Sequence, residues 1–290
     1  MRPAAELSLV LVTIIAAIGW VLSKYALQEF EPFTFLALRF VLAGFALAVP
    51  GWSQLRNITL QQGFRSVATG SVMGAALLVW ILALQDTDNV GVGAFIISLN
   101  VVAVPIIGRL LFGTVVPSGL ILALVPALVG LALLALDNGL VLDPGQGLFV
   151  IAMLALSLHL NLSSTYVQQV PALALSVIQL LTTGFIAGVA ALLSESWTPG
   201  LSSTAWLILL VSSLFATSLR FAIQNRMLQK VSASHASMIF LAEPVWTALL
   251  SALLLAERMS WQQLLGCLLI LLALLVYRAR VFKSLWRYFR

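Results

Sequence analysis

The sequence predicts an all-α polytopic membrane protein with ten transmembrane helices, arranged as two inverted five-helix repeats. The first observation is composition: 61% of the 290 residues are hydrophobic and only 9% are charged, whereas about a quarter of a soluble domain is charged. The second is a series of apolar runs of roughly 20 residues, the length that crosses a bilayer. The third is that Lys and Arg gather at alternate joins between these runs, as they do in the cytoplasmic loops of membrane proteins.

Turn-forming and charged residues divide the chain into ten apolar runs. We expect the first five helices over 7–27, 32–50, 66–84, 90–112 and 117–136. The second five are expected over 145–169, 171–193, 204–227, 233–256 and 260–280. The joins are short and carry turn chemistry, as at Glu31-Pro32, Pro50-Gly51 and Pro199-Gly200. The first run follows Arg2 but is long for a signal peptide and has no clear small-residue cleavage site, so we expect a retained helix.

The cationic residues predict on which side of the membrane each join lies. With an even number of helices both chain ends lie on one side, and that side holds eleven of the Lys and Arg residues, against two on the other. Because cytoplasmic loops carry the excess of Lys and Arg, we expect both termini to be cytoplasmic. The positive charge is then a topology signal, and no nucleic-acid partner is expected. The cytoplasmic set is Arg2, Arg56, Arg65, Arg109, Arg226, Lys230, Arg278, Arg280, Lys283, Arg287 and Arg290, and the outer pair is Lys24 and Arg258.

A weak internal repeat relates the first five helices to the last five. Trp20 and His159 each lie twelve residues before the proline that opens the following helix. Asn100 lies in the middle of the fourth helix, within about a residue of the position that Glu243 takes in the ninth. Five is an odd number, so the second repeat must enter the membrane in the opposite orientation. Inverted repeats are characteristic of secondary transporters, whose substrate site lies at the repeat interface near the bilayer midplane.

We expect the two repeats to occupy residues 1–140 and 141–282, followed by a basic amphipathic tail over 283–290. The tail suits a short helix that lies on the anionic cytoplasmic surface of the membrane. A disordered basic end is the alternative interpretation. No stretch is long enough to form a domain outside the membrane, so the function must reside among the helices or at their short loops.

Two other classes of membrane protein are alternatives to a transporter. A membrane-embedded enzyme commonly needs clustered carboxylates, a metal-binding set of His and Glu, or a nucleophile with its base. The two histidines are far apart, and neither HExxH nor GxSxG occurs. No catalytic residue, metal site or cofactor is therefore expected. A channel is the other alternative, although the sequence contains no repeated selectivity motif.

Several short motifs resemble the EamA type of the drug/metabolite transporter superfamily. In the second repeat they are Gln224, Lys230-Val231-Ser232, Glu243-Pro244, Ala256-Glu257-Arg258 and Gly266, and in the first Trp20, Arg39 and Ala83-Leu84. The resemblance implies a ten-helix fold with a central cavity. It also implies an exporter of amino acids, their derivatives or other small metabolites, which works by alternating access in the bacterial inner membrane. One departure is His159, where the family often carries Trp.

Glu243 is the leading candidate for the substrate site. It lies near the middle of the expected helix over 233–256, and intramembrane carboxylates usually face the bundle interior and serve function. It can contact a cationic group of the substrate, carry a proton, or only bond a neighbouring helix and support a kink at Pro244. Arg220 lies within about 4–5 Å of the same depth. It can pair with Glu243, or its long side chain can extend to the cytoplasmic surface, which is the interpretation that we prefer.

Other polar and aromatic residues within the spans complete the expected substrate site. They are Trp20, Trp80, Asn100, His159, Ser163 and Trp246. His159, with Ser163 one turn further on, is a candidate for substrate contact or proton transfer, or a neutral histidine bonded to a carbonyl. Arg39 is a further coupling or ion-pair candidate, with Glu29 or Glu31 as its alternative partner. The expected partners are a small metabolite, the lipid bilayer and, if transport is coupled, protons.

Overall fold

Helices account for every regular element in the computed structural model, which describes residues 3–86, 90–116, 118–135, 144–196, 200–254 and 260–288. Within these ranges seven segments are long and apolar enough to cross a membrane: Ala4–Ala26, Pro32–Leu55, Leu60–Gln85, Phe95–Phe112, Gln146–Tyr166, Ala172–Ser194 and Ser203–Leu228. Shorter apolar helices are Leu120–Leu133 and Trp261–Tyr277. The all-helical membrane fold is confirmed, whereas the number of ten crossings stays a prediction.

The helices follow one another with short connections. In the first half they are α1 (Pro3–Ala26), α2 (Pro32–Leu55), α3 (Leu60–Asp86), α4 (Val90–Ser98), α5 (Asn100–Phe112) and α6 (Ser118–Ala135). In the second half they are α7 (Pro144–Tyr166), α8 (Ala172–Ser194), α9 (Ser203–Val211), the π-helix η1 (Ser212–Leu219), α10 (Arg220–Leu228), α11 (Ala233–Phe240), α12 (Ala242–Leu254) and α13 (Trp261–Tyr288).

The expected boundaries between the second and third helices are wrong, because α2 continues to Leu55 and α3 already begins at Leu60. Three expected features lie wholly or partly outside the described residues, and one of them is the join at Pro199-Gly200. The turn expected at Pro50-Gly51 lies inside α2. The last turn of α2 is held in place by α8, because Gln54 Oε1 accepts a hydrogen bond from the backbone N–H of Leu173 (3.1 Å). The backbone of α13 is helical through most of the expected tail, but the side chains beyond Tyr277 are not among those described. The amphipathic tail and the Glu257-Arg258 motif therefore stay predictions.

Two of the segments expected from the sequence to cross the membrane are interrupted, at positions that the internal repeat relates. Leu99 separates α4 from α5, and Leu241 separates α11 from α12. The second break has a local cause, because Pro244 has no N–H to donate to the carbonyl of Phe240. A third irregularity is η1, which joins α9 to α10. Short π-helical segments of this kind are frequent at functional sites.

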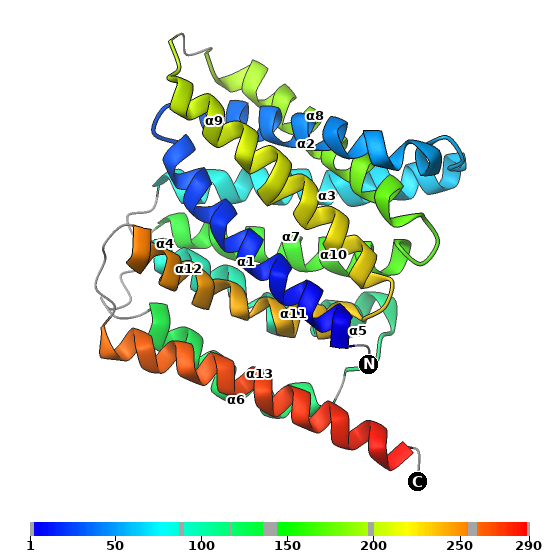
Figure 1. Cartoon of the computed structure of the whole chain (residues 1–290), viewed down its shortest axis with the longest axis vertical. Helices are drawn as coiled ribbons and strands as arrows, with labels where there is room; N and C mark the ends of the chain where they lie inside the picture. Colours follow the sequence, from blue (N-terminus) through cyan, green and yellow to red (C-terminus); the bar gives the residue numbers. More distant parts are fainter. Residues whose placement is uncertain are drawn as a thin grey trace.

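Helices of the two halves interleave (Figure 1). α2 packs along α8, α6 packs along α13, and α3 contacts both α7 and α8. α1 contacts η1 and α10 on one side and α11 and α12 on the other, and α7 correspondingly contacts α3 and the pair α4 and α5. Since α1 and α7 are the first helices of their halves, these pairings are the ones that a two-fold repeat requires. The centre of the molecule is therefore walled by equivalent elements from each half.

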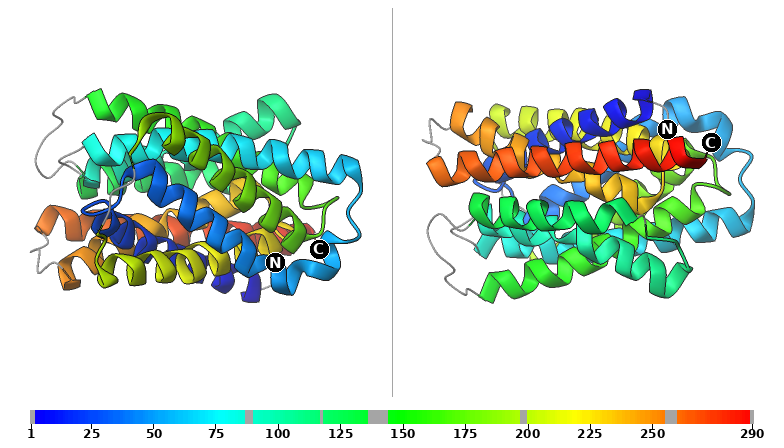
Figure 2. Two further views of the ribbon diagram at one scale, coloured as in Figure 1. Left: turned by 90° about the horizontal axis from the view of Figure 1, so that it is seen from above. Right: turned by 90° about the horizontal axis from the view of Figure 1, so that it is seen from below.

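Both termini lie at the same end of the helix bundle (Figure 2). At this end His235 Nε2, in α11, lies 3.7 Å from Glu6 Oε1, near the start of α1. Gln168, just after α7, donates a hydrogen bond to the carbonyl of Leu228 at the end of α10 (3.0 Å). α1 therefore begins, and α7 ends, at this end of the bundle, so the two helices run in opposite directions. Which end faces the cytoplasm stays a prediction.

The contact between α2 and α8 depends on glycine in both helices. A Cβ atom added at Gly44 would lie 2.6 Å from Leu181 Cδ2, and one added at Gly184 would lie 2.7 Å from Val41 Cγ2. Real Cβ atoms do not approach other carbons this closely. The two helices can therefore pack at this distance only because positions 44 and 184 carry no side chain. The outward face of α8 is apolar, with Leu192 87% exposed, as is expected of a surface that contacts lipid.

Candidate functional site

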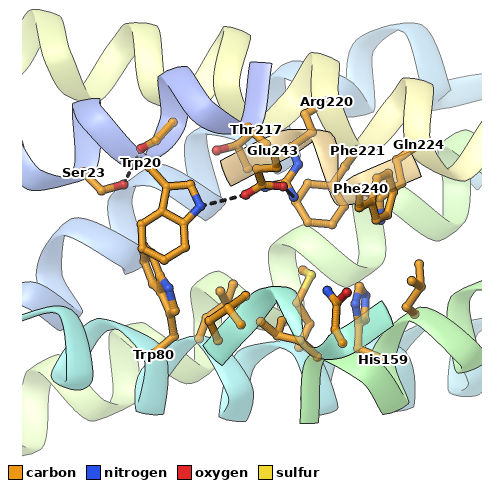
Figure 3. Close-up of a pocket in the computed structure, with 18 of the residues that line it drawn as sticks. Trp20, Ser23, Trp80, His159, Thr217, Arg220, Phe221, Gln224, Phe240 and Glu243 are labelled. Carbon is orange, nitrogen blue, oxygen red and sulfur yellow. Dashed lines mark hydrogen bonds and ion pairs between the residues drawn. The ribbon is translucent and has the colours of Figure 1, made fainter. Parts of the chain in front are cut away.

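A central cavity lies between helices of both halves (Figure 3). Its volume is about 140 Å³. A single water molecule occupies about 10–15 Å³ of such cavity space, so the cavity has room for about ten water-sized groups. It therefore suits a ligand of about ten non-hydrogen atoms. Seven of the nine side chains expected at the site line this cavity: Trp20, Arg39, Trp80, Asn100, His159, Arg220 and Glu243. The structure thus brings these residues together, while their roles in binding or coupling stay predictions.

Glu243 lies in the first turn of α12, directly after the break at Leu241. Its Oε1 accepts a hydrogen bond from Trp20 Nε1 (2.7 Å), and its Oε2 lies 3.7 Å from Arg220 Nη2. Arg220 therefore turns into the cavity, and the interpretation that it extends to the cytoplasmic surface is wrong. The physical reason is that a carboxylate inside the bundle attracts the guanidinium more strongly than the same pair would in water. The two side chains are 25% and 19% exposed, so the pair remains partly solvated.

Arg39 reaches the cavity from α2 and is buried. Its Nε donates a hydrogen bond to Thr217 Oγ1 (2.6 Å), and its Nη1 donates to Ser23 Oγ (2.8 Å). The π-helix η1 positions Thr217, whose hydroxyl donates to the Ser212 carbonyl five residues earlier (2.9 Å). The alternative pairing with Glu29 or Glu31 is wrong, because no carboxylate among the described residues forms an ion pair with Arg39.

Aromatic rings cover much of the cavity wall. The rings of Trp20 and Trp80 meet edge to face, with centroids 4.8 Å apart and an angle of 82° between their planes. The guanidinium of Arg220 lies over the ring of Phe221 (5.6 Å), and that of Arg39 lies over the ring of Phe40 (5.9 Å). Such contacts stabilise a cation through the ring quadrupole, but they do not neutralise its charge.

His159 lies across the cavity from Arg220 and Glu243 (Figure 3). Its Nε2 is 2.8 Å from Gln179 Nε2 and 3.1 Å from Ser163 Oγ. Since an amide N–H can only donate, His159 Nε2 is the acceptor, and the ring is neutral with its proton on Nδ1. The histidine is therefore bonded to side chains of α7 and α8, and the expected alternative of a bond to a carbonyl is wrong.

Two expected site residues do not line the cavity. Ser163 is fully buried behind His159, where it contacts both His159 and Gln179. Trp246 Nε1 donates a hydrogen bond to Thr13 Oγ1 (3.0 Å), which joins α12 to α1. Both residues can act on the cavity only through their neighbours.

Several cavity or supporting residues were not singled out from the sequence. Thr217 and Ser23 bind Arg39, and Gln179 binds His159 while accepting a hydrogen bond from Asn225 Nδ2 (2.8 Å). Hydroxyl residues carry no distinct signal because Ser and Thr occur in most helices of this chain. Gln179 does carry one, since it is the only amide side chain in the run 171–193.

The cavity offers groups that bind and orient a ligand. They include two guanidinium groups, one carboxylate, one neutral imidazole, two side-chain amides, several hydroxyls and a wall of indole and phenyl rings. Among the described residues no three potential metal ligands of the types His, Cys, Asp and Glu come together. This combination suits recognition of a small amphipathic molecule.

Comparison with known proteins agrees with this arrangement. A relative from Archaeoglobus fulgidus (strain ATCC 49558 / DSM 4304 / JCM 9628 / NBRC 100126 / VC-16), described as an uncharacterized transporter, is 27% identical over 282 residues, 97% of this chain and 87% of its own length. A protein of known crystal structure superposes with a TM-score of 0.80 over 95% of this chain and 96% of its own; at 16% identity this is a similarity of fold. The model of the EamA-like transporter family matches residues 3–136 and again 143–278. With two matches that together cover most of its length, the chain belongs to the EamA-like transporter family.

Proposed function

We propose that this protein is a secondary transporter that exports a small metabolite, an amino acid or a derivative, by alternating access around the central cavity. Membership of the EamA-like transporter family supports transport as the activity. The observation that carries the proposal is the position of Glu243, a carboxylate inside a membrane helix that faces the cavity and bonds Trp20 there. A carboxylate at the centre of a membrane helix costs about 2.5–3.5 kcal/mol. A role in binding or coupling explains why it is placed beside an open space.

Two roles for Glu243 follow from its surroundings. In the first, it accepts a hydrogen bond from a donor group of the substrate while the bond from Trp20 holds the carboxylate in position. In the second, it takes up a proton during exchange, which weakens its attraction to Arg220. Trp20, Trp80, Asn100 and His159 contact the substrate, whereas Ser163 and Trp246 hold the cavity wall through their neighbours.

The helix breaks give the proposed transporter its moving parts. Asn100 follows the break between α4 and α5, and Glu243 follows the break between α11 and α12. Transporters built from inverted repeats expose a midplane site to each side in turn, and interrupted helices commonly form that site. Bending at Leu99 and Leu241 would open the cavity toward one side and close it toward the other. We place both termini in the cytoplasm and the protein in the plasma membrane.

Counterflow in proteoliposomes tests the transport activity. Vesicles are loaded with one unlabelled compound from a panel of amino acids and derivatives, with and without a pH gradient, and uptake of the labelled compound is followed. A carrier accelerates this uptake by exchange, an enzyme converts the compound, and a channel shows no stimulation. Glu243→Gln should insert normally and lose exchange, while Glu31→Gln, the same change in the connection between α1 and α2, should retain it. If Glu243→Gln exchanged substrate at the wild-type rate at every pH, Glu243 would have only a structural role as a hydrogen-bond partner.

A double variant tests the pairing of Glu243 with Arg220. If the two side chains act as a pair in transport, the loss of exchange in Glu243→Gln combined with Arg220→Gln should be smaller than the sum of the single losses, expressed as free energies. Additive losses would show that the two residues act independently.

Cysteine accessibility tests the topology in a Cys267→Ser background. Lys230 and Ser194 are exposed at opposite ends of the bundle. Lys230→Cys should react with a membrane-impermeant reagent only from the cytoplasmic side, and Ser194→Cys only from the outside. The reverse pattern would overturn the proposed orientation.

A further inference from the structure

The charged groups that line the cavity do not balance. The described lining residues include two guanidiniums, those of Arg39 and Arg220, but only one carboxylate, that of Glu243. His159 adds no charge, because Gln179 donates to its Nε2 and keeps the ring neutral. The described lining residues therefore carry one net positive charge. Inside a membrane protein such a charge attracts a counter-ion more strongly than it would at a solvated surface.

The uncompensated charge belongs to Arg39. Its hydrogen bonds go to the hydroxyls of Ser23 and Thr217, which are neutral acceptors. The ring faces of Phe35 and Phe40 lie 5.7 and 5.9 Å from its guanidinium carbon and lessen the cost of burial without removing the charge. A buried charge without an opposite partner is unfavourable. A small anion that enters the cavity would remove this penalty.

Glu243 cannot neutralise both guanidiniums in this state. One of its oxygens accepts the indole N–H of Trp20, and the other faces Arg220 at 3.7 Å. The wall beside it contains further unmet bonding capacity, since Arg220 Nε and Gln224 Oε1 are buried without a hydrogen-bond partner. Both residues line the cavity from α10. A polar ligand group placed next to them would give these atoms partners after a small side-chain rotation.

We infer that the substrate carries one carboxylate and no cationic group. This inference rests on the proposed function and narrows its substrate class to a monocarboxylate of about ten non-hydrogen atoms, such as an amino-acid derivative whose nitrogen bears no charge. The carboxylate sits against Arg39 and Arg220, and the apolar body lies on the Trp20–Trp80 wall. The loaded cavity is then electrically neutral, whereas a zwitterion would leave one positive charge and an amine would raise it to two.

A series of ligands with the same skeleton tests this charge preference. We would measure binding of 3-phenylpropanoate, 3-phenylpropanamide, 3-phenylpropylamine and phenylalanine to the purified full-length protein in nanodiscs by isothermal titration calorimetry. The acid should bind about tenfold to a hundredfold more tightly than the amide, because it makes charged hydrogen bonds that the amide lacks, and the amine should bind most weakly. Binding of the amine or of phenylalanine as tightly as the acid would overturn the inference without any variant.

Single-residue variants then test whether Arg39 causes the preference for the acid over the amide. Arg39→Gln should reduce the ratio of acid to amide affinity to about one, whereas Arg39→Lys should keep part of it. The matched control is Arg65→Gln, because Arg65 contacts Gln169 and the ring of Tyr166 outside the cavity. An unchanged ratio in a folded Arg39→Gln protein would overturn the assignment to this residue.

Counterflow separates this inference from the proposed function. Exchange of a zwitterion or an amine, but not of the acid, would overturn the charge preference and leave the transporter in place. Tight binding of the acid with no exchange of any compound would support the charge preference and contradict transport.

Discussion

The contact between α2 and α8 gives the sharpest quantitative prediction. Gly184 and Gly188 lie one turn apart in α8, and both become better helix formers when changed to Ala. A Cβ atom at position 184 would lie 2.7 Å from Val41 Cγ2 and 2.8 Å from the Val41 backbone nitrogen, whereas one at position 188 would lie 3.8 Å from Ala37 Cβ. The first contact forces the helices apart, and the second is an ordinary van der Waals contact. Gly184→Ala therefore overpacks the interface, while Gly188→Ala does not.

The difference between the two variants isolates the packing cost. The gain in helix propensity, about 1 kcal/mol, is common to both and cancels. Overpacking costs about 1–3 kcal/mol, so Gly184→Ala should be less stable than Gly188→Ala by that amount. The melting temperatures of both variants are measured in the same detergent. Unfolding is monitored by the reaction of a fluorescent maleimide with the Cys267 thiol, which is buried in the folded protein. Equal melting temperatures would refute the close approach of α2 and α8 on which the arrangement around the cavity depends.

Three further predictions concern the site and one helix end. Trp20→Phe should lower exchange about tenfold or more, because a hydrogen bond to the charged Glu243 contributes about 1.5–3 kcal/mol; unchanged exchange would contradict a role for that bond. His159→Ala should weaken transport in proteoliposomes at an unchanged protein level, and unfolding instead would make the histidine a core residue. Hydrogen bonds from the hydroxyl and the backbone N–H of Ser202 lower the pKa of Glu29 below its ordinary value of 4.5. The ionised Glu29 therefore stabilises the fold at pH values above its ordinary pKa of 4.5, and this stabilisation is lost as the pH falls through the lowered pKa. Glu29→Gln should be less stable than wild type at pH 7, with a gap in melting temperature that closes at acid pH; a constant gap would contradict this.

The sequence by itself determined the class of fold and many of the residues around the cavity. A bilayer accepts only segments that are apolar over about 20 residues and that satisfy their own backbone hydrogen bonds, so composition and run length predict the helices directly. For the same reason a carboxylate such as Glu243 or a guanidinium such as Arg39 inside a run must face the protein interior. The same reasoning applies to the amide of Gln179, which is isolated among apolar, hydroxyl and glycine residues of its run.

Only the tertiary structure decided which of these groups meet. Arg220 pairs with Glu243 instead of extending to the surface, and Arg39 binds the hydroxyls of Ser23 and Thr217 instead of an acidic residue. The rotation of each helix about its axis and the depth of each break set these pairings. Rotation and depth arise from the packing of several helices together, and the glycine contacts between α2 and α8 are one example. Hydropathy along a single chain records how deep a side chain lies, but it does not record which neighbouring helix that side chain faces.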